Sequence, residues 1–216
     1  MTTKQVLFVG LNPIYYKTEG KLSHFPLIKT NPRASSDPQV KASLAAFSTY
    51  THVIISSKTC AKILNDYVSH QEWSQKRTIA IGTLTASCLQ SLGINPVLVI
   101  EEKTNEDLIN TLKNEDLRDA FVYWPHADVT ETLIANFLYF QNIPYADCIL
   151  YDTEVLHPID LPNLNSFNEI VFTTPTTIDA FVKNYGCLPD DKVLTSISHA
   201  TEKHLETVRE TCLSFA

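Results

Sequence analysis

Hydroxyl-bearing residues cluster at four points where a hydrophobic strand is followed by a helix. These residues are Ser56, Ser57, Thr83, Thr85, Thr173, Thr174, Thr176 and Thr201, with Lys58 beside the first pair. Taken singly, each turn has the pattern of a helix N-cap, in which a hydroxyl accepts a backbone N–H. Four such turns at the carboxyl ends of parallel strands favour a further role, because helix N-termini and hydroxyls bind carboxylates and phosphates. We therefore expect these residues to bind an anionic ligand.

Tyr151 is the candidate for proton transfer. It ends a predicted strand, in the phrase Leu150-Tyr151-Asp152-Thr153. A phenol has a reference pKa of about 10, so at neutral pH it keeps its proton and can donate it to a leaving oxygen. An aromatic residue of the core or of a hinge is the alternative interpretation. The seven histidines show no ligand spacing, and no glycine-rich nucleotide loop is present, so we expect neither a metal nor an organic cofactor.

The four turns form two related pairs. Val53-Ile54-Ile55-Ser56-Ser57-Lys58-Thr59 is echoed by Ile170-Val171-Phe172-Thr173-Thr174-Pro175-Thr176. Ile81-Gly82-Thr83-Leu84-Thr85-Ala86 is echoed, at nearly the same separation, by Ile197-Ser198-His199-Ala200-Thr201-Glu202. A shared offset in two phrases indicates an internal duplication of about half the chain.

Alternating strands and amphipathic helices position these turns. Strands are predicted at 5–9, 24–30, 51–56, 78–81, 96–99, 121–124, 145–151, 168–173 and 192–196, and helices at 59–68, 84–92, 105–112, 129–140 and 177–184. This order predicts an α/β fold whose parallel sheets have helices on both faces. After Val9, the short segment 10–20 stands where the second half has a full helix, so that helix is lost or replaced by a loop.

Proline-rich segments at 31–38 and 157–162 are the candidate linkers, and they follow equivalent strands of the two copies. Two crossings at equivalent points predict two lobes, each assembled from parts of both repeats. The predicted boundaries are 1–30 with 155–216 for one lobe and 34–150 for the other.

Composition narrows the function classes. The 216 residues carry a net charge of -7, which opposes broad nucleic-acid binding. Five scattered cysteines fit a reducing compartment and support neither a disulfide framework nor a metal site. No apolar run reaches the length of a membrane span, and the N-terminus lacks the pattern of a signal peptide. We therefore expect a cytoplasmic protein with a small-molecule ligand, no nucleic acid and no membrane, and a monomer by default.

The ordered set of motifs resembles the uroporphyrinogen-III synthase family. The family pattern has a strand ending in Pro-Leu-Ile, a Phe-Thr-Ser-Pro-like turn and an Ile-Gly-x-x-Thr-Ala turn in each half, and a Val-Tyr-x-Thr segment between lobes. Here these are Pro26-Leu27-Ile28, Ile55-Ser56-Ser57-Lys58, Phe172-Thr173-Thr174-Pro175, the two Ile81 and Ile197 phrases above, and Leu150-Tyr151-Asp152-Thr153. Order and spacing agree over nearly the whole chain.

The resemblance implies two flavodoxin-like lobes joined by a two-stranded linker, with the active cleft between them. It also implies conversion of hydroxymethylbilane into uroporphyrinogen III, with loss of water and inversion of ring D through a spiro intermediate, in heme biosynthesis. Tyr151 matches the family tyrosine proposed to assist departure of the hydroxyl, and Ser57, Thr85, Thr174 and Thr201 match its cleft hydroxyls. By the same resemblance the enzyme is a cyclising hydro-lyase without a cofactor, and transient contact with the preceding enzyme of the pathway is a further expectation.

Three departures keep a second interpretation open. Ser198 and Glu202 replace Gly and Ala in the second Ile-Gly-x-x-Thr-Ala turn, the first helix is abbreviated, and the chain ends soon after its last helix. The lost glycine and the short C-terminus favour a non-catalytic bilobed protein that binds a tetrapyrrole or another polycarboxylate. A regulatory domain would need an acidic pocket with a phosphorylatable Asp at a strand end, and no predicted strand ends in one.

Overall fold

The computed structural model describes residues 3–14, 16–101, 104–130 and 132–213. The chain divides into two compact units. Unit 1 is Met1–Lys29 with Glu154–Ala216, and unit 2 is Thr30–Thr153. The chain passes from one unit to the other within strands β3 (Ile28–Pro32) and β8 (Tyr145–Val155), which are neighbours in one sheet. The passages lie in regular strands rather than in the proline-rich segments 31–38 and 157–162.

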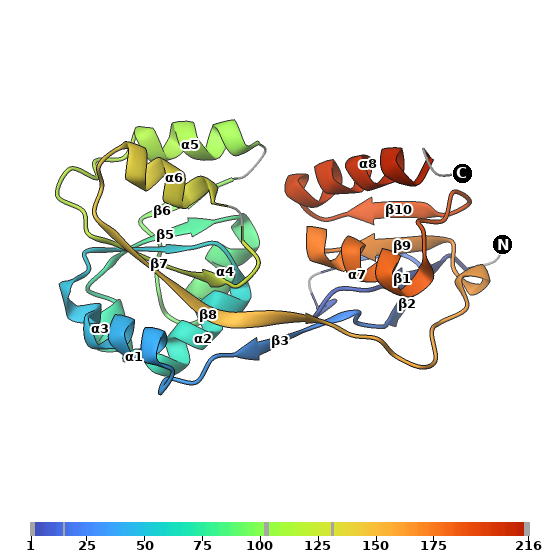
Figure 1. Cartoon of the computed structure of the whole chain (residues 1–216), viewed down its shortest axis with the longest axis horizontal. Helices are drawn as coiled ribbons and strands as arrows, with labels where there is room; N and C mark the ends of the chain where they lie inside the picture. Colours follow the sequence, from blue (N-terminus) through green and yellow to red (C-terminus); the bar gives the residue numbers. More distant parts are fainter. Residues whose placement is uncertain (1–2, 15, 102–103, 131, 214–216) are drawn as a thin grey trace. The chain divides into compact units, whose positions relative to one another are not determined.

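Unit 2 is built on a six-stranded sheet in the order β3-β8-β7-β4-β5-β6 (Figure 1). Its other strands are β4 (His52–Ile55), β5 (Arg77–Ile81), β6 (Leu98–Ile100) and β7 (Val122–Ala127). Strand β4 pairs in parallel with β5 and β7, β5 with β6, and β7 with β8. The turns that follow β4, β5 and β7 therefore lie at the same edge of the sheet, where open α/β sheets bind ligands.

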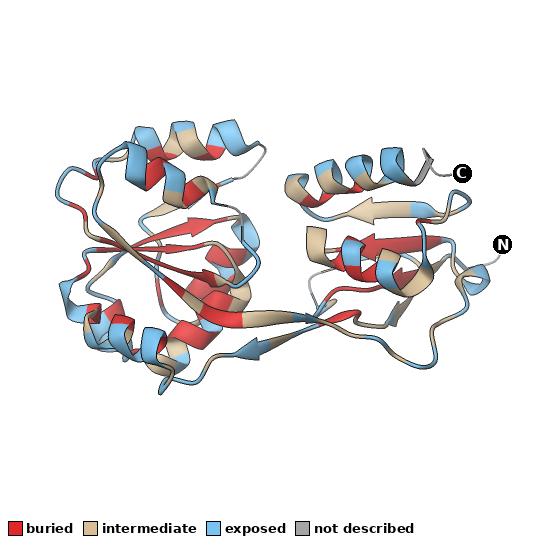
Figure 2. Cartoon of the chain, in the orientation of Figure 1, coloured by how far each residue is buried: buried red, intermediate tan, exposed pale blue. Residues whose placement is uncertain are grey.

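Helices cover both faces of this sheet. On one face lie α1 (Pro38–Ala45), α2 (Lys58–Tyr67), α3 (His70–Trp73) and α4 (Thr83–Ser91), together with the 3-10 turn η1 (Phe47–Thr49). On the other face lie α5 (Asn105–Lys113) and α6 (Leu133–Phe140). Strand β4 is buried along its whole length because it is covered from both sides, as Figure 2 shows for the central strands. This is the arrangement that a continuous hydrophobic strand predicts.

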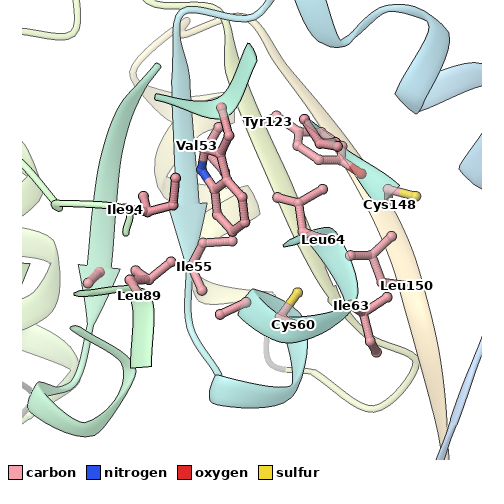
Figure 3. Close-up of a cluster of buried hydrophobic side chains, with 14 of the residues drawn as sticks. Val53, Ile55, Cys60, Ile63, Leu64, Leu89, Ile94, Tyr123, Cys148 and Leu150 are labelled. Carbon is pink, nitrogen blue, oxygen red and sulfur yellow. The ribbon is translucent and has the colours of Figure 1, made fainter. Parts of the chain in front are cut away.

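The core on the first face joins α2 to the strands that carry the candidate site. Figure 3 shows Val53 and Ile55 of β4 with Leu64 of α2 and Leu150 of β8, all fully buried. Complete burial of such a side chain stabilises the fold by roughly 1.5–3 kcal/mol. Cys60 lies in the same cluster, and its thiol donates to the carbonyl oxygen of Pro125 at 3.0 Å. The packing fixes the start of α2 against the ends of β7 and β8.

Unit 1 contains a four-stranded parallel sheet in the order β10-β9-β1-β2. Its strands are β1 (Gln5–Phe8), β2 (Lys21–His24), β9 (Glu169–Phe172) and β10 (Val193–Ser196), and its helices are α7 (Pro175–Tyr185) and α8 (His199–Leu213), with the 3-10 turn η2 (Leu164–Ser166). Both repeats thus form a β–α–β–α unit with adjacent parallel strands, β4 with β5 and β9 with β10.

The two faces of the unit 1 sheet are covered differently. Both α7 and α8 pack on the face that carries Leu7 and Ile170. The opposite face carries Phe8, whose ring centroid lies 5.7 Å from that of Tyr16 and 5.8 Å from that of His24. In the described residues no helix packs on this face. The α/β fold with parallel sheets is confirmed, but the expectation of helices on both faces is wrong for this sheet. Tyr16, from the segment between β1 and β2, packs on this face instead.

Candidate functional site

The first turn of interest joins β4 to α2. Ser57 is the N-cap of α2, and its hydroxyl accepts the backbone N–H of Cys60 at 3.0 Å. Ser56, Ser57 and Lys58 are all half-buried. Burial lowers the pKa of the Lys58 ammonium, and nearby Lys62 lowers it further while Cys88 raises it. The positive end of the α2 helix dipole lies at this turn and attracts an anion.

Tyr151 contacts this turn from β8. Its hydroxyl oxygen lies 3.2 Å from that of Ser57, and only 8% of the residue is exposed. Burial raises the pKa of Tyr151 to about 12, whereas the hydrogen bond with Ser57 lowers it and the negative charges of Cys60 and Asp128 would raise it. The phenol therefore keeps its proton at neutral pH. A buried, protonated hydroxyl beside a helix N-terminus can donate a hydrogen bond or a proton to an oxygen of a ligand.

The turn after β5 carries the second pair of candidates. Gly82 is the N-cap of α4 at φ +86°, a conformation that side chains disfavour. Thr83, the first residue of the helix, is exposed, whereas Thr85 is only 5% exposed. Thr83 therefore presents its side chain at the surface of this sheet edge, while Thr85 lies in the interior of the turn.

In unit 1 the turn after β9 is a capping box. The hydroxyl of Thr174 accepts the N–H of Thr177 at 3.3 Å, and the hydroxyl of Thr177 accepts the N–H groups of Thr173 and Thr174, both at 3.2 Å. Thr174 is exposed, and Thr173 and Thr176 are half-buried. The backbone N–H groups of Thr173 and Thr174 are thus already hydrogen-bonded to Thr177. The side chains of this turn are therefore the groups that can bind a ligand.

Gly10 allows this turn to lie close to the end of β1. A Cβ atom added to Gly10 would lie 2.3 Å from Cγ2 and 2.5 Å from Oγ1 of Thr173. Every other residue type would push Thr173 away. The sequence pattern does not single out Gly10 because the contact joins residues from the two ends of the chain, and no local signal marks it.

The turn after β10 uses a serine where its counterpart after β5 uses Gly82. The hydroxyl of Ser198 accepts the N–H of Thr201 at 3.3 Å and lies 2.7 Å from the Thr201 hydroxyl oxygen. Thr201 is completely buried. The Ser198 side chain therefore caps α8 and makes a glycine at this turn unnecessary. Ser198 does not have the positive φ that Gly82 has at the corresponding turn.

Within each unit the candidate residues lie at one sheet edge. Strands β4 and β5 bring together the unit 2 residues Ser56, Ser57, Lys58, Thr83 and Thr85, and β8 adds Tyr151. Strands β9 and β10 do the same in unit 1 for Thr173, Thr174, Thr176 and Thr201. Among the described residues, no group of three or more His, Cys, Asp or Glu side chains gathers as metal ligands would.

Comparison with known proteins identifies the lineage of this fold. A family model described as uroporphyrinogen-III synthase HemD matches residues 16–209, which is most of the chain. The chain belongs to the uroporphyrinogen-III synthase family. Membership of this family implies an enzyme of heme biosynthesis with a small-molecule tetrapyrrole substrate. The motif resemblance seen in the sequence is confirmed.

Solved structures of uroporphyrinogen-III synthases share the fold. A mutant enzyme from the extremely thermophilic bacterium Thermus thermophilus superposes with a TM-score of 0.63 at 12% identity, covering 95% of this chain and 89% of that one. The enzyme from Helicobacter pylori superposes with a TM-score of 0.61 at 15% identity, covering 99% of this chain and 100% of that one. A search of curated proteins gave no match. Low identity over nearly full coverage indicates that sequence has diverged while the arrangement of elements has been kept.

The family contains enzymes, and nothing in the comparisons favours the non-catalytic interpretation. The chain's described helices include none that combines the length and the apolar character of a membrane span.

Proposed function

We propose that this member of the uroporphyrinogen-III synthase family cyclises hydroxymethylbilane to uroporphyrinogen III as a hydro-lyase. Departure of the terminal hydroxyl as water leaves an azafulvene cation, stabilised by the pyrrole nitrogen. Attack on the substituted carbon of ring D gives a spiro intermediate, which fragments and recloses with that ring inverted. The final closure takes place at the unsubstituted α-carbon of ring D, which loses its proton, and this proton balances the one given to the leaving hydroxyl.

In this proposal Tyr151 is the general acid. The observation that carries the assignment is its hydroxyl, which lies 3.2 Å from Ser57 at the start of α2, in a setting that raises the pKa of the phenol to about 12. The phenol is therefore fully protonated at neutral pH. Proton donation by a positioned side chain contributes roughly 10²–10⁴-fold to a rate. Because the pyrrole itself expels the hydroxyl, one such donor is sufficient for this step.

The candidate binding groups in this proposal are the side-chain hydroxyls at the sheet edge of each unit and the positive end of the α2 dipole. Exposed or half-buried members are Ser56, Ser57, Lys58, Thr83, Thr173, Thr174 and Thr176. The substrate carries carboxylates around its rim, and a charge-assisted hydrogen bond to each is worth roughly 1–3 kcal/mol. Thr85 and Thr201 are buried, so in this proposal they act from within the turns, and a direct contact with the substrate stays a prediction.

The remaining parts of the proposal concern the cellular setting. We propose a monomer acting in the cytoplasm, which receives its substrate from the preceding enzyme by transient contact. The net charge of -7 requires that the carboxylates be held by local donors and not by the overall field.

Incubation of the chain with hydroxymethylbilane tests the proposal. The linear substrate closes spontaneously to isomer I, so the ratio of isomers III and I reports catalysis separately from spontaneous closure. We expect isomer III to predominate at a rate proportional to protein concentration. Isomer I alone at the spontaneous rate would overturn the proposal, and tight binding of the tetrapyrrole without turnover would identify a binding protein instead.

A further inference from the structure

We infer that Asp128 is a positioning residue for Tyr151, because it ties the end of β7 to the backbone of β8 at that tyrosine. This inference rests on the proposed role of Tyr151 as the proton donor. Asp128 directly follows β7, and Tyr151 lies in β8, the strand paired beside it. The two strands contact each other through an irregularity at this point.

The pairing of β7 with β8 slips immediately before Asp128. His126 pairs with Ile149, but the next residue, Ala127, pairs with Tyr151, so that one extra residue of β8 is accommodated. Successive side chains of a regular strand point to opposite faces. Here Leu150 and Tyr151 are consecutive, yet both belong to the core cluster that packs against α2. The bulge thus turns Tyr151 toward the face that carries Ser57, and bulges near active sites re-aim side chains in this way.

Asp128 makes two hydrogen bonds that hold this bulge in place. Its backbone N–H donates to the carbonyl oxygen of Tyr151 at 3.0 Å. Its carboxylate accepts the N–H of Thr153 at 2.8 Å. Together these bonds fix the backbone of β8 directly after Tyr151. Asp128 itself is exposed, so its side chain contributes no buried surface to the core.

Arg33, the residue that follows β3, binds β8 on the side away from β7. The N–H of Arg33 donates to the carbonyl oxygen of Leu150 at 2.8 Å. The Arg33 guanidinium binds the carboxylate of Asp152 through Nε and Nη2, the latter at 2.6 Å. Hydrogen bonding to Asp152 is the largest cause that raises the pKa of Arg33, and Asp128 adds a weaker attraction. Arg33 already has a carboxylate partner, which leaves the Asp128 carboxylate for Thr153.

Three variants separate positioning from general stability. Asp128→Ala removes the acceptor for Thr153, Asp128→Asn keeps an acceptor oxygen at the same place, and Asp66→Ala removes an exposed aspartate of α2 in the same unit as a control. We expect Asp128→Ala to lower kcat for isomer III about fivefold, with KM within about twofold of the wild type, because one net hydrogen bond is lost. Asp128→Asn should recover most of this loss, and Asp66→Ala should match the wild type.

The same substitution in a Tyr151→Phe background decides the inference. A residue that acts only through the Tyr151 hydroxyl has no effect once that hydroxyl is gone, so Asp128→Ala should then leave kcat unchanged. An equal fivefold loss in both backgrounds, or no loss in the wild-type background, would overturn the inference while leaving the proposed function intact. Full activity of Tyr151→Phe itself would overturn both the inference and the assignment of Tyr151 as the proton donor, whereas formation of isomer I alone by the wild type would overturn the proposed function. Asp128→Glu is a second test, because it moves the carboxylate by one methylene. It should also lower kcat for isomer III.

Discussion

The hydroxyl oxygens of Ser57 and Tyr151 lie 3.2 Å apart, although 94 positions separate the two residues in the sequence. Ser57 already accepts the N–H of Cys60 as the cap of α2, so its own proton is available for Tyr151. When Tyr151 donates its proton, the Ser57 hydroxyl can donate to the developing phenolate. This agrees with the direction of the interaction, since the hydrogen bond with Ser57 lowers the pKa of Tyr151. The cap of a helix and the acid of the proposed reaction thus form one local unit.

Ser57→Ala should therefore reduce both stability and activity. Loss of the N-cap costs about 1 kcal/mol of the free energy of unfolding. Loss of the hydrogen bond to Tyr151, also worth about 1 kcal/mol, should lower kcat for isomer III about five- to tenfold. The matched control is Ser69→Ala, which removes the N-cap of α3, where Ser69 accepts the N–H of Glu72. Denaturant unfolding and steady-state kinetics measure the two effects. Equal kcat for the two variants would contradict the role of Ser57.

The raised pKa of Tyr151 predicts a loss of stability at alkaline pH. The phenol has a pKa of about 12 in the folded protein, compared with its ordinary value of 10.0. A group whose pKa is raised on folding stabilises the folded state fully below the unfolded pKa, and this contribution is lost as pH rises through the folded pKa. Between about pH 8 and about pH 11 the loss is about 1.4 kcal/mol. Comparing the wild type with Tyr151→Phe by denaturant unfolding isolates it. A difference between the two proteins that stays constant with pH would contradict the burial of the phenol.

Gly10→Ala should disturb the Thr173 turn. The added methyl group would overlap Cγ2 and Oγ1 of Thr173, and overpacking of this kind costs roughly 1–3 kcal/mol. Since Thr173 belongs to the proposed binding set, we also expect a higher KM for the bilane. Adding Thr173→Ala removes the two closest atoms and should restore part of the stability. Thermal unfolding of the single and double variants checks this, and independent, additive losses would show that the two residues do not contact each other.

Most elements of the fold could be predicted because their hydrophobic patterns are local. The strand predicted at 24–30 is an exception, since the structure has β2 at Lys21–His24 and β3 at Ile28–Pro32. Pro26 lies between them and has no N–H to give to a ladder, so it interrupts the strand. Helix α1 is absent from the predicted elements, although its signal is present: Asp37 caps the helix and Pro38 is its first residue. A proline in a polar segment is also typical of a linker, so the pattern of segment 31–38 predicts a linker and does not reveal the start of α1.

The candidate site was predictable only in part. The turns could be found because a hydroxyl before a helix is a local pattern. Which hydroxyls are exposed depends on tertiary packing, and the structure buries Thr85 and Thr201. The bulge that turns Tyr151 toward Ser57 depends on the register of two strands, which no sequence pattern in either strand reveals. The role of Asp128 cannot be recognised from the sequence for the same reason. The helix predicted from residue 129 begins at Leu133 in the structure.

The rate of isomer III formation by Tyr151→Phe, compared with the wild type and with Tyr139→Phe, tests the central claim most directly. Tyr139 is 69% exposed on α6 of the same unit, so its variant controls for the loss of a phenolic hydroxyl. We predict that Tyr151→Phe lowers kcat by about 100-fold or more, the range for a general acid, while Tyr139→Phe matches the wild type. Turnover by Tyr151→Phe equal to that of the wild type would contradict the assignment of Tyr151 as the proton donor.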